Sequence, residues 1–532
     1  MTDVDVIVIG AGFAGLRALY TLRKMGKKVV VLEASADLGG VWYHNGYPGA
    51  RCDVESYDYS YSFSPELEQE WRWTERYATQ PEILRYINHV AERFDLRKHI
   101  EFGTRMTRAA YDEAGVRWAV RAEDGRQWSG QFLMMCVGQL STTKQPAYPG
   151  QESFKGEVIH SGVWPKHPVD LAGKRVAIIG TGSSGMQMTP VIAKEAAHLT
   201  VFQRTANYSI PARNGPLSDE FKQYVKTHAD EIRAVMHSTP NGHPFVINTR
   251  KVFDVDDAER ERIFEDGWAK GGLQFRAAFG DVLVDEVANA QAAGFIKRKI
   301  REVVKDPATA ELLADIDHPF AAKRPPIDTE YFEAFNRSNV ALVDVRKDPV
   351  AEITPTGLKL ESGRSFDLDI IVFATGFDAM TGPLLRMEIT GRDGLALKDV
   401  WSAGPKTYLG LQVAGFPNLF TMTGPGSPSV LCNMPVAIEQ HAEWIAGCIA
   451  HMRANGLRTV ETTEGAAEEW GRHVNDLANA TLLPKATHSW YLGANVPGKP
   501  RVFMPYAGGM ARYREHCAEV VAQGYPGFVL SA

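Results

Sequence analysis

Cysteines are few in this chain of 532 residues, and long apolar runs are missing from it. The five cysteines are widely spaced and form no C-x-x-C pair, which argues against a disulfide framework, a zinc site and a redox dithiol. No apolar run reaches the roughly 18 residues of a membrane span, and no basic, cleavable leader precedes the first strand. We therefore expect a soluble, cytoplasmic protein without membrane association or a metal site.

A strong excess of charge is also missing. The chain has 58 Lys and Arg against 64 Asp and Glu, for a net charge of −6, and its basic residues are dispersed. A broad positive field for polyanions is therefore absent, and nucleic acid is not an expected partner. The length predicts two or three domains with substantial cores. The sequence leaves the oligomeric state open, and a monomer is plausible.

What the sequence does contain, at its start, is a dinucleotide-binding turn. An apolar run, Val4 to Ile9, leads into Gly10-Ala-Gly-Phe-Ala-Gly15 and then into a helical pattern from Leu16 to Met25. In such a unit the first glycine permits the tight turn, the second lets a pyrophosphate approach, and the third allows close helix–strand packing. The pattern predicts a Rossmann unit that binds a dinucleotide through Gly10, Gly12, Phe13, Ala14 and Gly15.

The next strand ends in a carboxylate that selects the nucleotide. The strand Lys28 to Leu32 is apolar from Val29 onward, and Glu33 follows it, 18 residues after Gly15. A carboxylate there accepts hydrogen bonds from a ribose diol and repels a 2′-phosphate, so this site should take FAD or NAD. Its position at the start of the chain favours FAD. The competing interpretation is a doubly wound fold that binds no nucleotide.

A loop rich in glycine and aromatics follows, from Gly39-Gly-Val-Trp42 through Tyr47-Pro-Gly to Asp53. It has few helix signals and is typical of an ordered loop beside a planar ligand. Trp42 and Tyr47 are equally consistent with ordinary packing. Asp53 is a stronger indication of a functional site, because a carboxylate in such surroundings usually has a cationic partner. Further on, a helix is expected over 82–94, and strands over 118–123 and 132–138, the last returning to the first sheet.

The unit then repeats. Lys174 to Ile179 leads into Gly180-Thr-Gly-Ser-Ser-Gly185 and a second helix, and the strand Leu199 to Phe202 is followed by Gln-Arg204-Thr205. The position equivalent to Glu33 thus carries a guanidinium beside a hydroxyl, which suits a 2′-phosphate. We predict NADPH at this second site. The alternative for Arg204 is a solvated surface side chain.

Residues 214–320 have the pattern of charged helices, including 219–236 and 258–270. This pattern predicts a helical insertion in the second nucleotide domain. The insertion ends in Lys323-Arg324-Pro-Pro, where two prolines restrict a pair of cations. On composition alone this pair belongs to a solvated loop. A strand then ends in the turn Ala374-Thr-Gly376, after which we expect the chain to rejoin the first fold.

Between the two glycine turns lies the dodecapeptide F-x-G-x-x-x-H-x-x-x-W-P, residues 154–165. Alone, its histidine is more consistent with an ordinary hydrogen-bonded core residue than with a functional one. Together with both turns, the G-G-x-W…Y-P-G-x-x-x-D loop, K-R-P and A-T-G, the chain resembles the type I Baeyer–Villiger monooxygenases over essentially its whole length. The phenylacetone, cyclopentanone and cyclohexanone monooxygenases are the members it is most similar to. In the dodecapeptide, the residues that match the motif of this family are Phe154, Gly156, His160, Trp164 and Pro165.

The resemblance implies an α/β protein with two Rossmann-type domains and a helical insertion. The implied reaction inserts one oxygen atom of O₂ next to a ketone carbonyl, giving an ester or lactone. NADPH is the reductant, and a C4a-peroxyflavin is the nucleophilic oxidant. The implied domains are 1–145 with 377–532 for FAD, 150–213 with 321–376 for NADPH, and 214–320 for the insertion.

The resemblance also implies the roles of particular residues. Arg324 is the catalytic cation, Asp53 holds it, and His160 organises the linkers between the domains. Further FAD contacts are implied at Gly40, Val41, Trp42, Arg51, Cys52, Asp53, Tyr59 and Met106. NADPH contacts are implied at Gly180, Thr181, Gly182, Ser183, Ser184, Gly185, Gln187, Arg204, Thr205, Lys323, Arg324 and Trp490. The substrate pocket is expected at Ser429, Val430, Leu431 and Met434.

Three alternatives are weaker. An N- or S-oxygenating flavin monooxygenase shares both glycine turns, but its central motif lacks the ending Trp164-Pro165 and it needs no counterpart of Arg324. A disulfide reductase needs a C-x-x-C pair, which this chain lacks. A flavin-binding sensor or electron-transfer protein would leave the second nucleotide site and the Asp53–Arg324 pair without a role.

Overall fold

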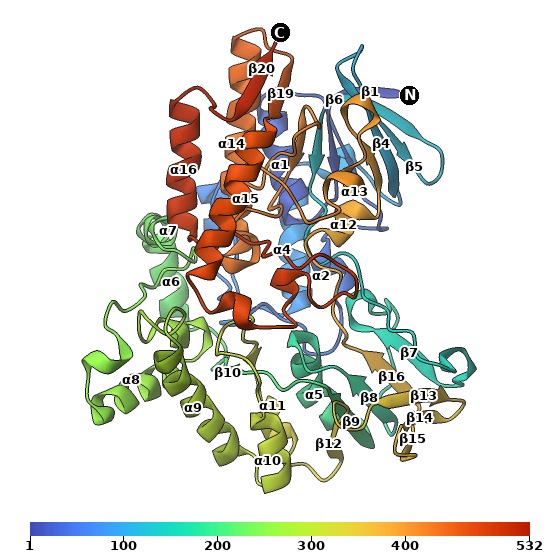
Figure 1. The fold of residues 1–532 in the computed structure, drawn as a ribbon, viewed down its shortest axis with the longest axis vertical. Coiled ribbons are helices and arrows are strands. Elements are labelled where there is room, and N and C mark those ends of the chain that lie inside the picture. Colours follow the sequence, from blue (N-terminus) through green and yellow to red (C-terminus); the bar gives the residue numbers. More distant parts are fainter.

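A computed structural model describes all 532 residues and contains two main sheets, one in the upper part of the molecule and one in the lower part (Figure 1). The first sheet has the order β17-β4-β5-β6-β1-β2-β3, with β18 beside β6. Its strands are β1 (Thr2–Ile9), β2 (Val29–Leu32), β3 (Ile100–Glu101), β4 (Met106–Asp112), β5 (Arg117–Ala122), β6 (Gln127–Met135), β17 (Glu388–Thr390) and β18 (Leu419–Thr421). The expected return to this sheet is confirmed, because β6 pairs in parallel with β1.

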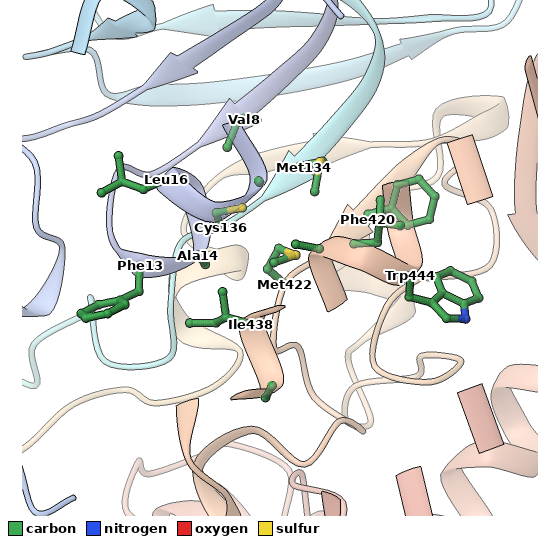
Figure 2. Close-up of a cluster of buried hydrophobic side chains, with 14 of the residues drawn as sticks. Val8, Phe13, Ala14, Leu16, Met134, Cys136, Phe420, Met422, Ile438 and Trp444 are labelled. Atoms are coloured by element: carbon green, nitrogen blue, oxygen red, sulfur yellow. The ribbon is translucent and has the colours of Figure 1, made fainter. Parts of the chain in front are cut away.

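Helices α1 (Phe13–Lys24) and α14 (Met434–Ala454) pack together beside the first sheet. Figure 2 shows the core that forms there, with Val8 and Met134 from the strands facing Leu16 and Ile438 from the two helices. These four side chains are at most 3% exposed. Each such side chain stabilises the fold by about 1.5–3 kcal/mol. The N-terminal glycine turn is therefore built onto a rigid core.

Shorter and peripheral elements complete this upper part. The expected loop over residues 39–53 contains a single helical turn, α2, which the glycine-rich sequence did not predict. The other elements are α2 (Val41–His44), α3 (Pro65–Glu70), α4 (Gln80–Arg93), α12 (Gly382–Leu385), α13 (Leu397–Val400), α15 (Glu464–Asn479), α16 (Met510–Ala522) and the strand pair β19 (Thr459–Thr462) with β20 (Phe528–Ser531).

The second sheet is entirely parallel, with the order β12-β9-β8-β16-β7. Its strands are β7 (Glu157–His160), β8 (Arg175–Ile179), β9 (His198–Gln203), β12 (Val340–Asp344) and β16 (Ile370–Phe373). Helix α5 (Ser183–Glu195) follows β8, as in the first unit. The dodecapeptide forms the edge strand β7. Beside this sheet lies a meander of β13 (Val350–Thr354), β14 (Gly357–Leu360) and β15 (Ser365–Asp367).

Residues 214–320 are helical and contain no strand, as expected. The segment expected as one helix over 219–236 breaks at His228 into α6 (Asp219–Thr227) and α7 (Ala229–Ser238). Met236 of α7 belongs to the core of the first sheet, whereas Phe264 and Phe295 belong to the core of the second. These two lie on α8 (Asp257–Lys270) and α9 (Glu286–Val303), and α10 (Pro307–Ala314) follows. The insertion therefore packs against both sheets.

The segment after the insertion runs from α10 to β11 (Ile327–Asp328), which pairs with β10 (Ile210–Pro211), and then into α11 (Tyr331–Ala334). This segment carries Lys323 and Arg324 into the region between the sheets. None of the helices combines the length and the apolar character that crossing a bilayer requires.

Candidate functional site

Asp53 and Arg324 form an ion pair although 271 residues separate them. The guanidinium Nε and one Nη donate to the two carboxylate oxygens at 2.5 and 2.8 Å, and the other Nη donates to the carbonyl oxygen of Val430 at 2.8 Å. Asp53 follows α2, Arg324 precedes β11, and Val430 lies in a 3₁₀ turn, Ser429–Leu431. Three distant segments thus fix one guanidinium.

The surroundings hold this pair in its charged form. Burial alone would raise the pKa of Asp53, but the charge and hydrogen bonds of Arg324 outweigh burial and lower it. Burial opposes the charge on Arg324, yet Asp53 raises the pKa of the guanidinium above its usual value. The side chains of Asp53 and Arg324 remain 25% and 20% exposed, so the pair is not sealed in the core.

The first glycine turn is tightly enclosed by backbone. Gly10 has φ +99°, and a Cβ on it would lie 2.6 Å from the carbonyl oxygen of Cys136. A Cβ on Gly15 would lie 1.8 Å from the carbonyl oxygen of Gly10, and one on Gly12 would lie 3.5 Å from Cα of Gly40. The turn therefore has the shape that a pyrophosphate requires, and the Gly39–Gly40 segment covers it.

Glu33 stands at the end of β2, where the sequence predicts a ribose-binding carboxylate. It is 6% exposed, and its two oxygens accept hydrogen bonds from the backbone N–H groups of Ala11 and Ser35 at 2.7 and 2.8 Å. Each carboxylate oxygen can accept a second bond. Glu33 is therefore held in place with acceptor capacity left for a diol.

The other predicted FAD contacts fall into two groups. Trp42 donates from its indole to the hydroxyl of Tyr59 at 3.1 Å, and Phe13 packs against Tyr59 with ring centroids 5.2 Å apart. These residues border the Asp53 segment. Arg51 instead pairs with Glu75 at 3.0 Å, and Met106 is buried at 4% exposure in β4. Cys52 is also buried, and Val41 begins α2.

The second glycine turn has the same backbone shape but is open. A Cβ on Gly180 would lie 2.4 Å from the carbonyl oxygen of Ala374, and one on Gly185 would lie 2.1 Å from that of Gly180. Around Gly182, in contrast, nothing lies within 4 Å of the Cβ position. The hydroxyl of Thr181 donates to the carbonyl oxygen of Thr205 at 2.7 Å, which ties the turn to the end of β9. The second turn therefore also has the backbone shape that a pyrophosphate requires.

Cations gather beside this second turn. Arg204 is exposed and pairs with no carboxylate, and Lys323 is half-buried nearby. Burial lowers the pKa of Lys323, Asp317 opposes this, and the charge of Arg204 lowers the pKa further. Two like charges at close range without enough carboxylate to neutralise them are typical of a phosphate site.

Helix α5 contacts the aromatic loop of residues 39–53 through Gln187. The hydroxyl of Tyr47 donates to Gln187 Oε1 at 2.8 Å, and Gln187 Nε2 donates to the carbonyl oxygen of Arg51 at 3.1 Å. Ser183 is exposed and Ser184 half-buried at the start of the same helix. The aromatic loop therefore lies directly against the helix that begins at the second nucleotide turn.

His160 ends β7, and its ring bridges the chain segments that connect the sheets. Its Nδ1 accepts from the N–H of Gly162 at 3.0 Å, and its Nε2 lies 3.2 Å from the carbonyl oxygen of Lys144. These two contacts assign the proton to Nε2. Burial lowers the pKa of His160, which favours the neutral ring. Of the other motif residues, Trp164 is buried in the second core, and Phe154, Gly156 and Pro165 lie near the surface.

The predicted pocket residues differ in their solvent exposure. Ser429 is fully buried with φ +51°, and Val430 is 8% exposed, whereas Leu431 and Met434 are half-buried. Trp490 is half-buried in a 3₁₀ turn, Trp490–Leu492, beside Leu140 and Met380. Val430 is therefore the member of this group whose contact with Arg324 is direct.

Two side chains near Arg324, those of Tyr491 and Arg276, were not predicted from the sequence. Tyr491 is 2% exposed, and the charges of Arg324, Arg276 and Asp53 all act on its hydroxyl. Its position next to Trp490 was the available signal. Arg276 lies in the insertion, where a single arginine among many charged residues gives no signal at all.

The chain matches the family described as flavin-binding monooxygenase-like over residues 3–214. It is 43% identical to a Baeyer–Villiger monooxygenase of Pseudooceanicola batsensis, covering 99% of this chain and 96% of the other. It is 41% identical to cyclohexanone 1,2-monooxygenase of an Acinetobacter species, again over 99% and 96%. A phenazine N-monooxygenase of Lysobacter antibioticus is 39% identical over 99% and 97% of the two chains.

Solved structures agree with these relatives. An oxidised steroid monooxygenase bound to NADP is 50% identical and superposes with a TM-score of 0.96 over the whole of both chains. The NADP⁺ complex of cyclohexanone monooxygenase from Rhodococcus sp. Phi1 is 43% identical, with a TM-score of 0.98 over 100% of this chain and 99% of the other.

Proposed function

This chain belongs to the Baeyer–Villiger monooxygenases of the flavin-binding monooxygenase-like family, and we propose that Arg324 and Asp53 form its catalytic centre. The enzyme uses FAD and NADPH to insert one oxygen atom of O₂ next to a ketone carbonyl. The reduced flavin supplies the activated oxygen when it is bound. The two-Rossmann fold with a helical insertion agrees with this family.

The observation that carries the proposal is the set of hydrogen bonds of Arg324. A guanidinium has five N–H groups, and three of them bind Asp53 and the carbonyl oxygen of Val430. Two N–H groups therefore stay free to donate to an oxygen atom that gains negative charge during attack on the ketone. Because Asp53 fixes the plane of the guanidinium, these donors need no reorganisation when the charge develops.

The division of the chain between cofactors follows the two sheets. Residues 1–145 and 377–532 would hold FAD, with the pyrophosphate at the Gly10–Gly15 turn and the ribose at Glu33. Residues 150–213 and 321–376 would hold NADPH at the Gly180–Gly185 turn. Arg204, Thr205 and Lys323 would bind its 2′-phosphate through charge-assisted hydrogen bonds. The enclosed first turn and the open second turn support this assignment.

The ketone would reach Arg324 past Val430, Leu431 and Met434. The names of the relatives range from acetone monooxygenase to a monooxygenase of a trimethylcyclopentenylacetyl-CoA, so identity alone does not select one ketone. The steroid monooxygenase is 50% identical. We therefore assign a ketone as the substrate class and leave its skeleton to experiment.

The test combines product analysis with substitution of the ion pair. With NADPH and ¹⁸O₂, the wild-type enzyme should convert ketones to esters or lactones that carry one ¹⁸O atom. Arg324→Ala and Arg324→Lys should lower the rate of ester formation about 10²–10³-fold, while Arg324→Ala and Asp53→Asn still bind flavin. Ester formation by Arg324→Ala at the wild-type rate would contradict the proposal.

The relative named for phenazine N-oxidation makes N-oxygenation the second candidate activity. Tertiary amines and sulfides therefore belong in the same product panel. If only N-oxides or sulfoxides formed, while ketones gave hydrogen peroxide alone, the role of Arg324 in ketone oxidation would be wrong.

A further inference from the structure

Arg276 is an arginine without a partner in the interior of the molecule. It lies in a 3₁₀ helix, Gly272–Ala277, and is half-buried. Its Nε is buried and has no hydrogen-bond acceptor, and the side chain forms no ion pair. A buried donor without an acceptor destabilises the fold unless a ligand supplies one. This side chain is therefore a candidate binding group.

The helix that carries Arg276 packs along the segment that carries Arg324. The ring of Phe275 contacts the ring of Phe320 with centroids 5.6 Å apart. On the other flank, a Cβ on Gly272 would lie 3.9 Å from Cδ1 of Ile327, and Leu273 shares a small core with Ile327. Arg324 lies between Phe320 and Ile327 in sequence, so the packing brings Arg276 beside it.

The charges that act on Arg276 identify its surroundings. Burial lowers the pKa of Arg276, Tyr491 opposes this, Arg324 lowers the pKa further and Asp53 raises it. Since Asp53 already neutralises Arg324 through a bidentate contact, its carboxylate cannot also neutralise a second guanidinium fully. The catalytic centre therefore carries one positive charge in excess.

The 2′-phosphate of NADPH does not account for this excess charge. Lys323 interacts with Asp317 and Arg204, whereas Arg276 interacts with Tyr491, Arg324 and Asp53. The neighbouring residues Lys323 and Arg324 thus face different groups. The proposed phosphate site lies on the Lys323 side, and Arg276 lies on the side of Arg324 and Asp53.

We propose that Arg276 binds a carboxylate on the ketone substrate, so that the enzyme prefers keto acids over neutral ketones of the same size. A guanidinium and a carboxylate match in shape and form two parallel hydrogen bonds. The substrate carboxylate is negatively charged, so it neutralises the excess positive charge of the catalytic centre. The inference rests on the proposed catalytic role of Arg324, because it places the carboxylate beside the reacting carbonyl.

The test compares 4-oxocyclohexanecarboxylate with its neutral methyl ester. We expect the wild-type enzyme to have a KM for the acid about 10–100-fold below its KM for the methyl ester. Arg276→Met should raise the KM of the acid by about the same factor and change that of the methyl ester less than about twofold. Arg276→Lys should retain part of the preference, because a lysine keeps the charge without the planar fork.

Arg262→Met is the matched control, because Arg262 lies on α8 with a side chain that is 62% exposed. Calorimetric titration of the acid onto the oxidised, NADP⁺-bound enzyme measures the same contact without turnover. Flavin content and melting temperature show whether each variant is folded. If Arg276→Met does not fold, Arg276→Lys replaces it in the comparison of the acid with the methyl ester.

Three results would overturn the inference. The first is equal KM values of the wild-type enzyme for acid and methyl ester. The second is an equal rise of both KM values in Arg276→Met. The third is a weaker NADP⁺ affinity of that variant, which would assign Arg276 to the nucleotide. If neutral ketones gave lactones in these cases, the proposed function would stand. If no ketone gave a lactone, the proposed function itself would fail.

Discussion

The two glycine turns follow the same sequence pattern, but their surroundings differ. Gly40 covers the first turn at 3.5 Å from the Cβ position of Gly12, whereas the same position on Gly182 meets nothing within 4 Å. Glu33 is buried with two backbone donors, while its counterpart Arg204 is exposed without a carboxylate partner. An enclosed turn suits a cofactor that stays bound, and an open turn suits one that exchanges.

The largest contrast should come from the third glycine of each turn. A Cβ at Gly15 or Gly185 would meet backbone oxygen at 1.8 or 2.1 Å, so alanine forces either turn apart. Gly15→Ala should yield protein with almost no flavin and activity lowered at least about 10²-fold. Gly185→Ala should stay yellow but be reduced slowly by NADPH. Visible absorbance and stopped-flow reduction measure both effects.

Gly447 and Gly294 provide controls for this pair, because they lie within helices and no atom is within 4 Å of either Cβ position. Their alanine variants should keep both flavin and reduction rate. A Gly15→Ala protein with a full complement of flavin would show that the first turn does not hold FAD.

The next contrast concerns which nucleotide is recognised. Arg204→Gln removes one of two cations at the second site and should raise the KM for NADPH about 10–100-fold, with little effect on NADH. Flavin content should not change. Arg337→Gln is a control, since Arg337 is also exposed. An equal rise in the KM for NADPH and for NADH would show that Arg204 does not bind the 2′-phosphate.

Much of this contrast could be predicted from the sequence, because strand, glycine turn and terminal side chain are local features. Glu33 and Arg204 were both identified from their distance to the preceding turn. The resemblance paired Asp53 with Arg324 across 271 residues, which no local pattern could do. The exposure of Gly182, the contacts of Gln187 and the unpaired Arg276 depend on tertiary packing, which no local sequence pattern predicts.

The break at His228 is another feature that the sequence did not predict. The helical pattern of 219–236 continues across it, but Tyr57 packs against Phe221 while Met236 enters the first core. Two separate helices satisfy both contacts. Packing against the first sheet therefore outweighed local helix propensity.

A smaller effect is expected at the second glycine of each turn. Gly12 and Gly182 have φ −84° and −80°, which alanine adopts without strain. Neither substitution should lower the melting temperature. Each should weaken the binding of the nucleotide at its own turn about fivefold, because the added methyl group occupies space for the pyrophosphate. Ultrafiltration measures FAD and titration measures NADP⁺. A Gly182→Ala protein that lost flavin instead would reverse the assignment of the two turns.

Acidification should affect the two parts of the molecule in opposite directions. His441 packs beside the first sheet, where Thr423 and Tyr513 contact its ring at 2.9 and 3.0 Å, and burial lowers its pKa from 6.5 to about 3. Between these values the unfolded state binds the extra proton, so falling pH destabilises this region by up to about 1.4 kcal/mol per pH unit.

Asp328 in β11 behaves in the opposite way. Burial raises its pKa from 3.8 to about 6, although Ser209 donates a hydrogen bond that opposes the shift. Between these values the folded state holds the extra proton, so falling pH stabilises the region around β11. Hydrogen exchange at about pH 7 and about pH 5, corrected for intrinsic rates, should show faster opening of the peptides around α14 and slower opening of those around β11. His441→Gln should abolish the first change alone and Asp328→Asn the second alone, whereas a common response of both regions would mean that the two sheets unfold as one unit.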